Sequence, residues 1–143
     1  MDPNVLRIIL PLLAIMESGG DPNAIGDGGA ARGILQIHPV MVREVNRIVG
    51  EDRYTLADRV DPNASCAMAS VYLNYWGPRR LRRAKGLSVE DQVVLLGRLW
   101  NGGPNGHKKA ATARYGRKLR RLYHNHRRAH LGGHKGAKPC RQS

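Results

Sequence analysis

A single glutamate stands where a strongly apolar segment gives way to a glycine-rich one. The run "VLRIILPLLAIM" ends at Met16, Glu17 follows it, and glycines recur from Gly19 to Gly33. A carboxyl group at the end of an apolar helix is partly removed from water, which raises its pKa and suits a general acid. The glycines would let an extended polymer approach that carboxyl group closely. A solvated carboxylate at a helix end is the alternative interpretation of Glu17.

Asp27, in the same glycine-rich loop, could supply a second carboxylate. A pair of carboxyl groups can act as acid and base in the cleavage of a glycosidic bond. Asp27 could hold a water molecule opposite Glu17, or its side chain could cap a tight turn. The loop does not fit a calcium-binding EF-hand, because counting from Asp21 puts Ile25 and Arg32 at positions that need oxygen ligands.

The elements that must position these residues are helical. The sequence shows helical spacing, proline near the predicted starts and glycine near the predicted ends, and no run of alternating polar and apolar residues. We expect Pro11 to kink or restart the first helix. The first predicted helix begins near Asp2 and runs to Glu17, and the second follows Pro39 up to Gly50. The others cover residues 61–77, 88–103 and 107–128. The prediction is a mainly α, single-domain protein.

Three motifs in one order carry a resemblance to a known family. They are "ESGGDPNAIGDGG", "ARGILQI" followed by "HP", and "WNGGPNG", within residues 4–123. Together they resemble the soluble lytic transglycosylase and goose-type lysozyme group of the lysozyme-like superfamily. The resemblance implies a mainly α fold of about five or six helices with a sugar-binding cleft. It also implies cleavage of the β-1,4 bond between N-acetylmuramic acid and N-acetylglucosamine in peptidoglycan. We expect the protein to need no cofactor and to be a monomer.

The first two motifs place the expected catalytic residue. Glu17 matches the family's catalytic acid, and Ser18 matches the serine that supports it. Gln36 matches a glutamine that lines the cleft, and the resemblance therefore makes it a substrate-binding residue. Gln36 could instead tie down the backbone of its loop.

The third motif and the last helix supply further candidate substrate-binding residues. Asn101 matches an asparagine that usually follows a tyrosine, but Trp100 occupies that aromatic position here. Tyr115 resembles a tyrosine that lies near the catalytic glutamate. Asn101 could also be an ordinary residue at a helix end, while Trp100 and Tyr115 could belong to the core.

The reaction product divides the family. A hydrolase needs a carboxylate that activates water, whereas a lytic transglycosylase lets the substrate's own 6-hydroxyl attack and forms a 1,6-anhydro product. Asp27 in "GDGG" is similar to the Gly-Asp of goose-type lysozymes, but a second aspartate of that pattern is His38 here. We favour a lytic transglycosylase and keep hydrolysis as the alternative.

Positive charge dominates the chain and its C-terminal part. The formal net charge is +13, and no acidic residue follows Asp91. We expect the basic C-terminal helix to bind anionic cell-wall polymers or lipopolysaccharide. The alternatives are binding to nucleic acid and a catalytically weak or inactive binding protein. His126 and His130 have helical spacing for a metal, but no acidic or thiol ligand lies near them in sequence, so we expect no metal site.

The ends of the chain and its cysteines add smaller expectations. We divide the chain into a domain over residues 1–130 and a flexible basic tail over 131–143. The N-terminal apolar run lacks a basic leader and a cleavage site, so we predict a buried helix rather than a signal peptide. Cys66 and Cys140 are expected to be free thiols.

The protein would act at the bacterial cell wall, in the periplasm, outside the cell or as an endolysin delivered by a phage.

Overall fold

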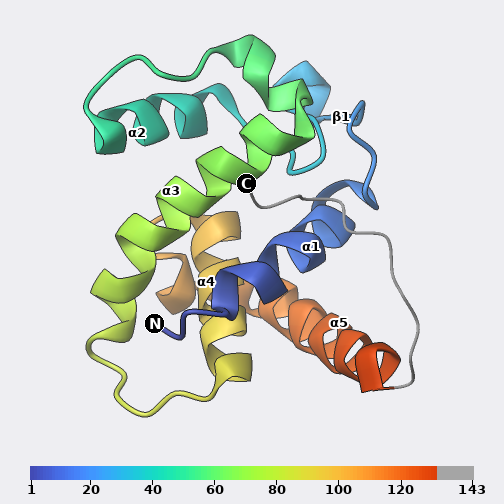
Figure 1. The fold of residues 1–143 in the computed structure, drawn as a ribbon, viewed down its shortest axis with the longest axis vertical. Coiled ribbons are helices and arrows are strands. Elements are labelled where there is room, and N and C mark those ends of the chain that lie inside the picture. Colours follow the sequence, from blue (N-terminus) through green and yellow to red (C-terminus); the bar gives the residue numbers. More distant parts are fainter. Residues whose placement is uncertain (132–143) are drawn as a thin grey trace.

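The structure is a computed structural model that describes residues 1–131, and within them the chain is mainly helical, as predicted. Figure 1 shows α2 and a small hairpin at one end of the molecule and α4 and α5 at the other, with α3 running between them. The α-helices are α1 (Val5–Ser18), α2 (Pro39–Val49), α3 (Pro62–Leu81), α4 (Val89–Gly102) and α5 (Ala113–Leu131). Short 3₁₀ turns are η1 (Asp27–Gly29), η2 (Leu56–Val60), η3 (Gly106–Lys108) and η4 (Ala110–Thr112).

Helix α1 forms the centre of the core and ends at the candidate site. It packs against α3, α4 and α5, and the apolar side chains on its inner faces have almost no exposure to solvent. These side chains are Val5, Ile9, Leu10, Leu12, Leu13 and Ala14. The prediction of a buried N-terminal helix is confirmed. The expected restart at Pro11 is wrong, because α1 is continuous there and the packing of its neighbours outweighs one missing backbone donor.

Glycine and capping signals predicted the helix boundaries with mixed success. Gly50 ends α2 in a left-handed conformation, as predicted. Gly77 does not end α3, which continues to Leu81. A Cβ atom at Gly77 would lie 2.7 Å from Leu96 Cδ2 of α4, so this glycine permits close packing of two helices. The last helix begins at Ala113 rather than near residue 107, because η3 and η4 precede it.

A small antiparallel hairpin interrupts the helical fold where no strand was predicted. Strand β1 (Ile25–Gly26) pairs with β2 (Ala31–Arg32), and η1 lies between them. Arg32 also forms a bridge to Ile37, which brings the chain back toward the start of α2. Each strand has two residues, which is too short for an alternating pattern to be visible in the sequence.

The core is aliphatic, as the absence of phenylalanine predicts. Within the core, Tyr72 of α3 and Trp100 of α4 meet edge to face, with their ring centroids 5.9 Å apart. Within residues 1–131, no helix is both long enough and apolar enough to cross a membrane.

Cys66 differs from its expected state. It is buried on α3 and disulfide-bonded, so the prediction of a free thiol is wrong for this residue. A low cysteine count argues against a framework of several bridges, but it does not exclude one bridge. Cys140 and the predicted basic tail lie outside the described residues, except that Leu131 is the last residue of α5.

Close packing of α4 on α5 gives a test of the fold. A Cβ atom at Gly97 would collide with Leu119 Cδ2, which is fully buried. We predict that Gly97→Ala lowers the free energy of unfolding by about 1–3 kcal/mol through overpacking. Arg121→Ala is the control, because it lies at an exposed position of α5 and adds no atom to the packed interface. Urea unfolding of both variants measures the difference, and equal stability would contradict the prediction.

Candidate active site

Glu17 lies half-buried in the last turn of α1. Its carboxyl group is hydrogen-bonded to a residue from the C-terminal part of the chain. The Tyr115 hydroxyl, from the first turn of α5, donates a hydrogen bond of 2.7 Å to Glu17 Oε1. Burial raises the pKa of Glu17 most strongly, while the Tyr115 hydrogen bond lowers it. The negative charge of Asp27 raises that pKa further, the His38 ring lowers it, and the pKa as a whole is raised. Such a carboxyl group is suited to hold a proton and to give it up.

Tyr115 is half-buried and acts as the donor in this bond. Burial raises its pKa first, and the neighbouring Glu17 charge raises it further, so the hydroxyl keeps its proton and acts as a donor. The structure therefore brings together Glu17 and Tyr115, two of the residues that the sequence marked.

Ser18 fixes the backbone next to Glu17. Its hydroxyl donates to the carbonyl of Ile34 at 2.8 Å and to that of Ala14 at 3.2 Å, and it accepts from the Gly20 amide at 3.2 Å. These bonds tie the end of α1 to the segment that follows the hairpin. Ser18 therefore holds the position from which Glu17 projects.

Gln36 holds the glycine-rich loop together. Its side-chain amide donates to the carbonyls of Ala24 at 3.1 Å and Gly33 at 2.9 Å. A Cβ atom at Gly26 would run into the Gln36 side chain, so the loop needs a glycine there. These contacts correspond to the second interpretation of Gln36, in which it ties down the loop backbone.

Asp27 and His38 form a pair across the hairpin. Asp27 Oδ2 lies 2.8 Å from His38 Nε2, and both side chains are exposed to solvent, by 70% and 41% respectively. Among the described residues, no backbone amide bonds the Asp27 carboxylate, so turn capping does not account for its position. The sequence marked His38 only as a departure from the goose-type pattern. The pairing depends on how the hairpin folds, and no pattern among neighbouring residues in the sequence predicts it.

Trp100 and Asn101 lie near the end of α4. Trp100 is only 8% exposed and packs in the core against Tyr72, so little of its ring is open to a ligand. Asn101 is exposed in the last turn of the helix. Substrate binding by these two residues stays a prediction.

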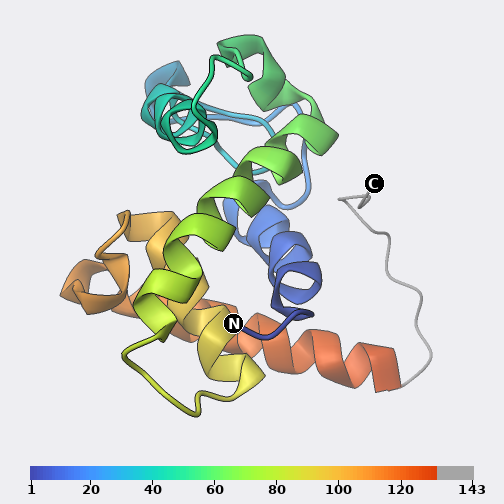
Figure 2. The same cartoon turned by 60° about the vertical axis from the view of Figure 1, so that its left-hand side comes forward.

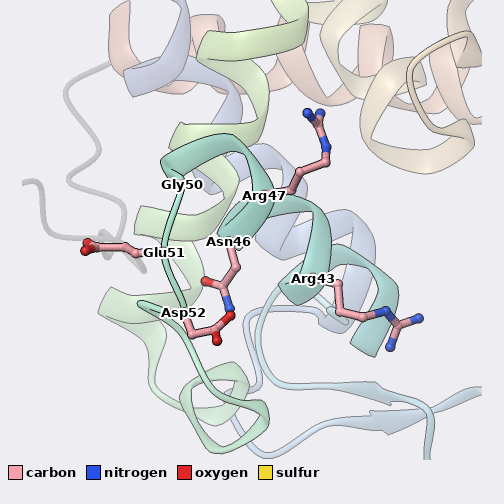
Figure 3. A pocket seen from close by; sticks show the side chains of 6 residues that line it. All are labelled: Arg43, Asn46, Arg47, Gly50, Glu51 and Asp52. Carbon is pink, nitrogen blue, oxygen red and sulfur yellow. The ribbon is translucent and has the colours of Figure 1, made fainter.

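A separate open hollow lies at the end of α2, as Figure 3 shows. Two of its polar side chains already have partners: Asn46 bonds the backbone of Tyr54 through both ends of its amide, and Arg47 pairs with Glu44. Glu17 is not among its lining residues, so we do not assign catalysis to it. The lining residues are Arg43, Asn46, Arg47, Gly50, Glu51 and Asp52.

Potential metal ligands are sparse in the part of the chain that the structure describes. The rings of His126 and His130 lie 4.1 Å apart on α5. Across residues 1–131, no group of three histidine, cysteine, aspartate or glutamate side chains gathers as a metal site would require.

The fold and this site define a class of protein. A mainly α domain in which a half-buried glutamate at the end of a central helix is hydrogen-bonded to a half-buried tyrosine is a lysozyme-like, glycosidase-type domain. The family model described as Transglycosylase SLT domain matches residues 2–121, and the chain belongs to this family of peptidoglycan lytic transglycosylases. A search of curated proteins and a search of solved structures each returned no match.

The Tyr115 hydrogen bond gives a prediction about Glu17. Because this bond favours the charged carboxylate, Tyr115→Phe removes a contribution that lowers the pKa of Glu17. We expect that pKa to rise in the variant. Carbon-13 NMR titration of the glutamate carboxyl groups measures it, with Glu17→Gln used to assign the signal.

Tyr54→Phe is the control for this titration, because Tyr54 bonds Asn46 through its backbone and belongs to a different part of the fold. An unchanged or lowered Glu17 pKa in Tyr115→Phe would show that the hydrogen bond does not act on Glu17 as the geometry indicates.

Proposed function

We propose that Glu17 is the general acid of a peptidoglycan lytic transglycosylase that cleaves the β-1,4 bond between N-acetylmuramic acid and N-acetylglucosamine. The observation that carries this proposal is the half-buried Glu17 carboxyl group, with a raised pKa and a hydrogen bond from Tyr115. The family membership over residues 2–121 supports the same reaction.

The geometry suggests how the proton is delivered. Tyr115 bonds Oε1 of Glu17, which leaves Oε2 as the oxygen that carries the proton to the glycosidic oxygen. As that proton transfers, the bond from the muramyl anomeric carbon to the leaving sugar breaks. The muramyl 6-hydroxyl then bonds the anomeric carbon, and its proton passes to the Glu17 carboxylate. The products are a 1,6-anhydromuramyl end and a new N-acetylglucosamine end, and Glu17 regains its proton.

The remaining residues assist this acid in different ways. Ser18 and Gln36 hold the backbone around Glu17, and the glycine-rich loop leaves space for a glycan strand to approach. Asn101 is exposed, and we propose that it contacts the sugar. The protein would act where peptidoglycan is, at the periplasmic or outer side of the cell membrane.

A second role is proposed for α5, which carries a stripe of positive charge. Arg114, Arg117, Lys118 and Arg121 share one face of this helix and are all exposed. None of the four has an ion-pair partner among residues 1–131. We call Arg114, Arg117, Lys118 and Arg121 the basic stripe. Figure 2 shows the C-terminal half of α5, which follows the basic stripe, extending past α1, beyond the bulk of the domain.

The nearby acidic groups do not neutralise the basic stripe. Glu90 and Asp91, at the start of α4, both pair with Arg120 on a different side of α5. Like charges at these helical spacings destabilise a helix by about 0.2–0.5 kcal/mol per pair. A phosphate-bearing envelope polymer would relieve that repulsion, so we propose that the basic stripe holds the enzyme on such a polymer.

Product analysis tests the catalytic role of Glu17. We predict that purified peptidoglycan treated with the protein gives mainly 1,6-anhydromuramyl ends by mass spectrometry. Glu17→Gln keeps the shape of the side chain but cannot donate the proton, so product formation should fall by about 100-fold or more. Glu44→Gln is a matched control at a glutamate that pairs with Arg47. A Glu17→Gln protein with normal activity would exclude Glu17 as the acid.

Removing positive charges from two different places on the protein tests whether the basic stripe binds an envelope polymer. We predict that replacing Arg114, Arg117 and Arg121 by Gln weakens binding to vesicles that carry lipopolysaccharide by about 10-fold at low salt. The control replaces Arg82, Arg83 and Lys85, which lie between α3 and α4, and therefore has the same net charge. Equal loss in both variants would indicate a nonspecific charge effect. Stronger binding to DNA than to the vesicles would favour nucleic acid as the partner.

A further inference from the structure

Thr112 is a buried polar residue that the proposed proton transfer does not involve. Its side chain is 3% exposed at the end of η4, and α5 begins at the next residue, Ala113. Tyr115, which bonds Glu17, lies in the first turn of that helix. A buried hydroxyl costs free energy unless it is hydrogen-bonded, so its partners show what it holds in place.

The Thr112 hydroxyl joins three segments of the chain. It donates to the carbonyl of Gly106 in η3 at 2.6 Å, and it accepts from Nε of Arg98 in α4 at 2.9 Å. The carbonyl of Lys109 lies 3.0 Å from the same hydroxyl and accepts from a second nitrogen of the Arg98 guanidinium at 2.8 Å. A Cβ atom at Gly106 would collide with the backbone carbonyl of Arg98, so η3 lies directly against α4. Thr112 therefore ties the residues before α5 to α4.

Arg98 also contacts α5 on the other side of Tyr115. A Cβ atom at Gly116 would lie 3.0 Å from Arg98 Cδ, so the aliphatic stem of Arg98 packs where α5 has no side chain. The Tyr115 ring lies over α4, because a Cβ atom at Gly97 would meet Tyr115 Cε1 at 3.5 Å. The guanidinium of Arg98 thus bonds Thr112 before Tyr115, and its stem meets Gly116 after it.

The position of the Tyr115 hydroxyl depends on how the start of α5 is held. The first four backbone amides of a helix have no partner within the helix, so its first turn relies on contacts from outside. The hydrogen bond from Tyr115 to Glu17 is 2.7 Å long, and such a bond weakens steeply when its geometry is lost. A small displacement of the first turn of α5 would therefore weaken the contact with Glu17.

We propose that Thr112, held by Arg98, is a positioning residue for the acid, because it fixes the start of α5 where the Tyr115 hydroxyl reaches Glu17. This rests on the proposed role of Glu17 as the general acid. Thr112 and Arg98 act through Tyr115 and need no contact with the glycan.

Removing the Thr112 hydroxyl tests this role. Thr112→Val keeps the shape of the side chain but leaves Nε of Arg98 without its acceptor. We predict that the variant raises the pKa of Glu17, in the same direction as Tyr115→Phe, because the Tyr115 hydrogen bond lowers that pKa. The yield of anhydro ends should fall about 10-fold, because the acid is misplaced. Carbon-13 NMR titration and mass spectrometry of the products measure the two effects.

A conservative variant and a control accompany this measurement. Thr112→Ser keeps the hydroxyl, so it should leave the anhydro yield within about twofold of wild type and the pKa of Glu17 unchanged. Ser70→Ala is the control, because its hydroxyl bonds the carbonyl of Cys66 within α3 at 2.8 Å. It should not change the pKa of Glu17. A Thr112→Ser protein that behaves like Thr112→Val would contradict the role of the hydroxyl.

A double variant separates positioning of Tyr115 from a general loss of stability. If Thr112 acts through Tyr115, then Thr112→Val should not raise the pKa of Glu17 further in a protein that already carries Tyr115→Phe. A further rise as large as that in the single variant would mean that Thr112 acts by another route, and it would overturn the proposal.

A second substitution decides the matter if Thr112→Val does not fold, which melting temperatures report. Arg98→Met keeps an unbranched stem and removes the guanidinium that holds Thr112, so it should also raise the pKa of Glu17. The charged groups that act directly on that pKa are Asp27 and His38, so the loss of the Arg98 charge does not by itself account for a rise. An unchanged pKa in folded Thr112→Val would overturn the proposal, and so would an unchanged pKa in Arg98→Met where Thr112→Val is unfolded.

The outcomes separate this proposal from the proposed function. Titration of Glu17 needs no substrate, so it reports on Thr112 whether or not the protein releases product. Absence of product from the wild type would overturn the role of Glu17 as the acid, while a raised pKa in Thr112→Val would still support the positioning of Tyr115. Loss of product in Glu17→Gln with an unchanged pKa in the Thr112 variant would leave the acid in place and overturn the role of Thr112.

Discussion

The hydrogen bond between Tyr115 and Glu17 is the interaction on which the site depends. Glu17 must be partly removed from water, yet a carboxyl group in that position needs a partner. α1 meets the first requirement, because its apolar side chains form the core and carry Glu17 to the edge of it. α5 meets the second requirement with the hydroxyl of Tyr115. The packing of α4 against α5 at Gly97 then sets where that hydroxyl lies.

The glycine-rich segment solves a different problem, which is how to keep an open loop in one conformation. Glycines increase the conformational entropy that folding must overcome. Side chains from outside the loop offset that cost. Arg59 reaches in from η2, Gln36 bonds the loop carbonyls, and Ser18 ties the loop to α1. The same segment therefore holds Asp27 at a φ of 48°, a left-handed conformation that surrounding contacts must enforce.

Local signals predicted much of the fold, and long-range contacts explain where they failed. The apolar run before Glu17, Pro62 at the start of α3 and Gly50 at the end of α2 act within a few residues, so sequence alone was sufficient. Gly77 looks like a helix end, but its role is set by Leu96 on another helix. The pairing of Asp27 with His38 depends on a hairpin of two-residue strands that no periodicity reveals.

The two ends of the Tyr115–Glu17 bond are 98 positions apart in the chain. During synthesis, α1 leaves the ribosome long before α5 exists, so a growing chain has the glutamate without its partner. An assembled site therefore requires a nearly complete polypeptide. A chain that ends before α5 would therefore carry Glu17 on α1 without the hydroxyl that accompanies its carboxyl group in the folded domain.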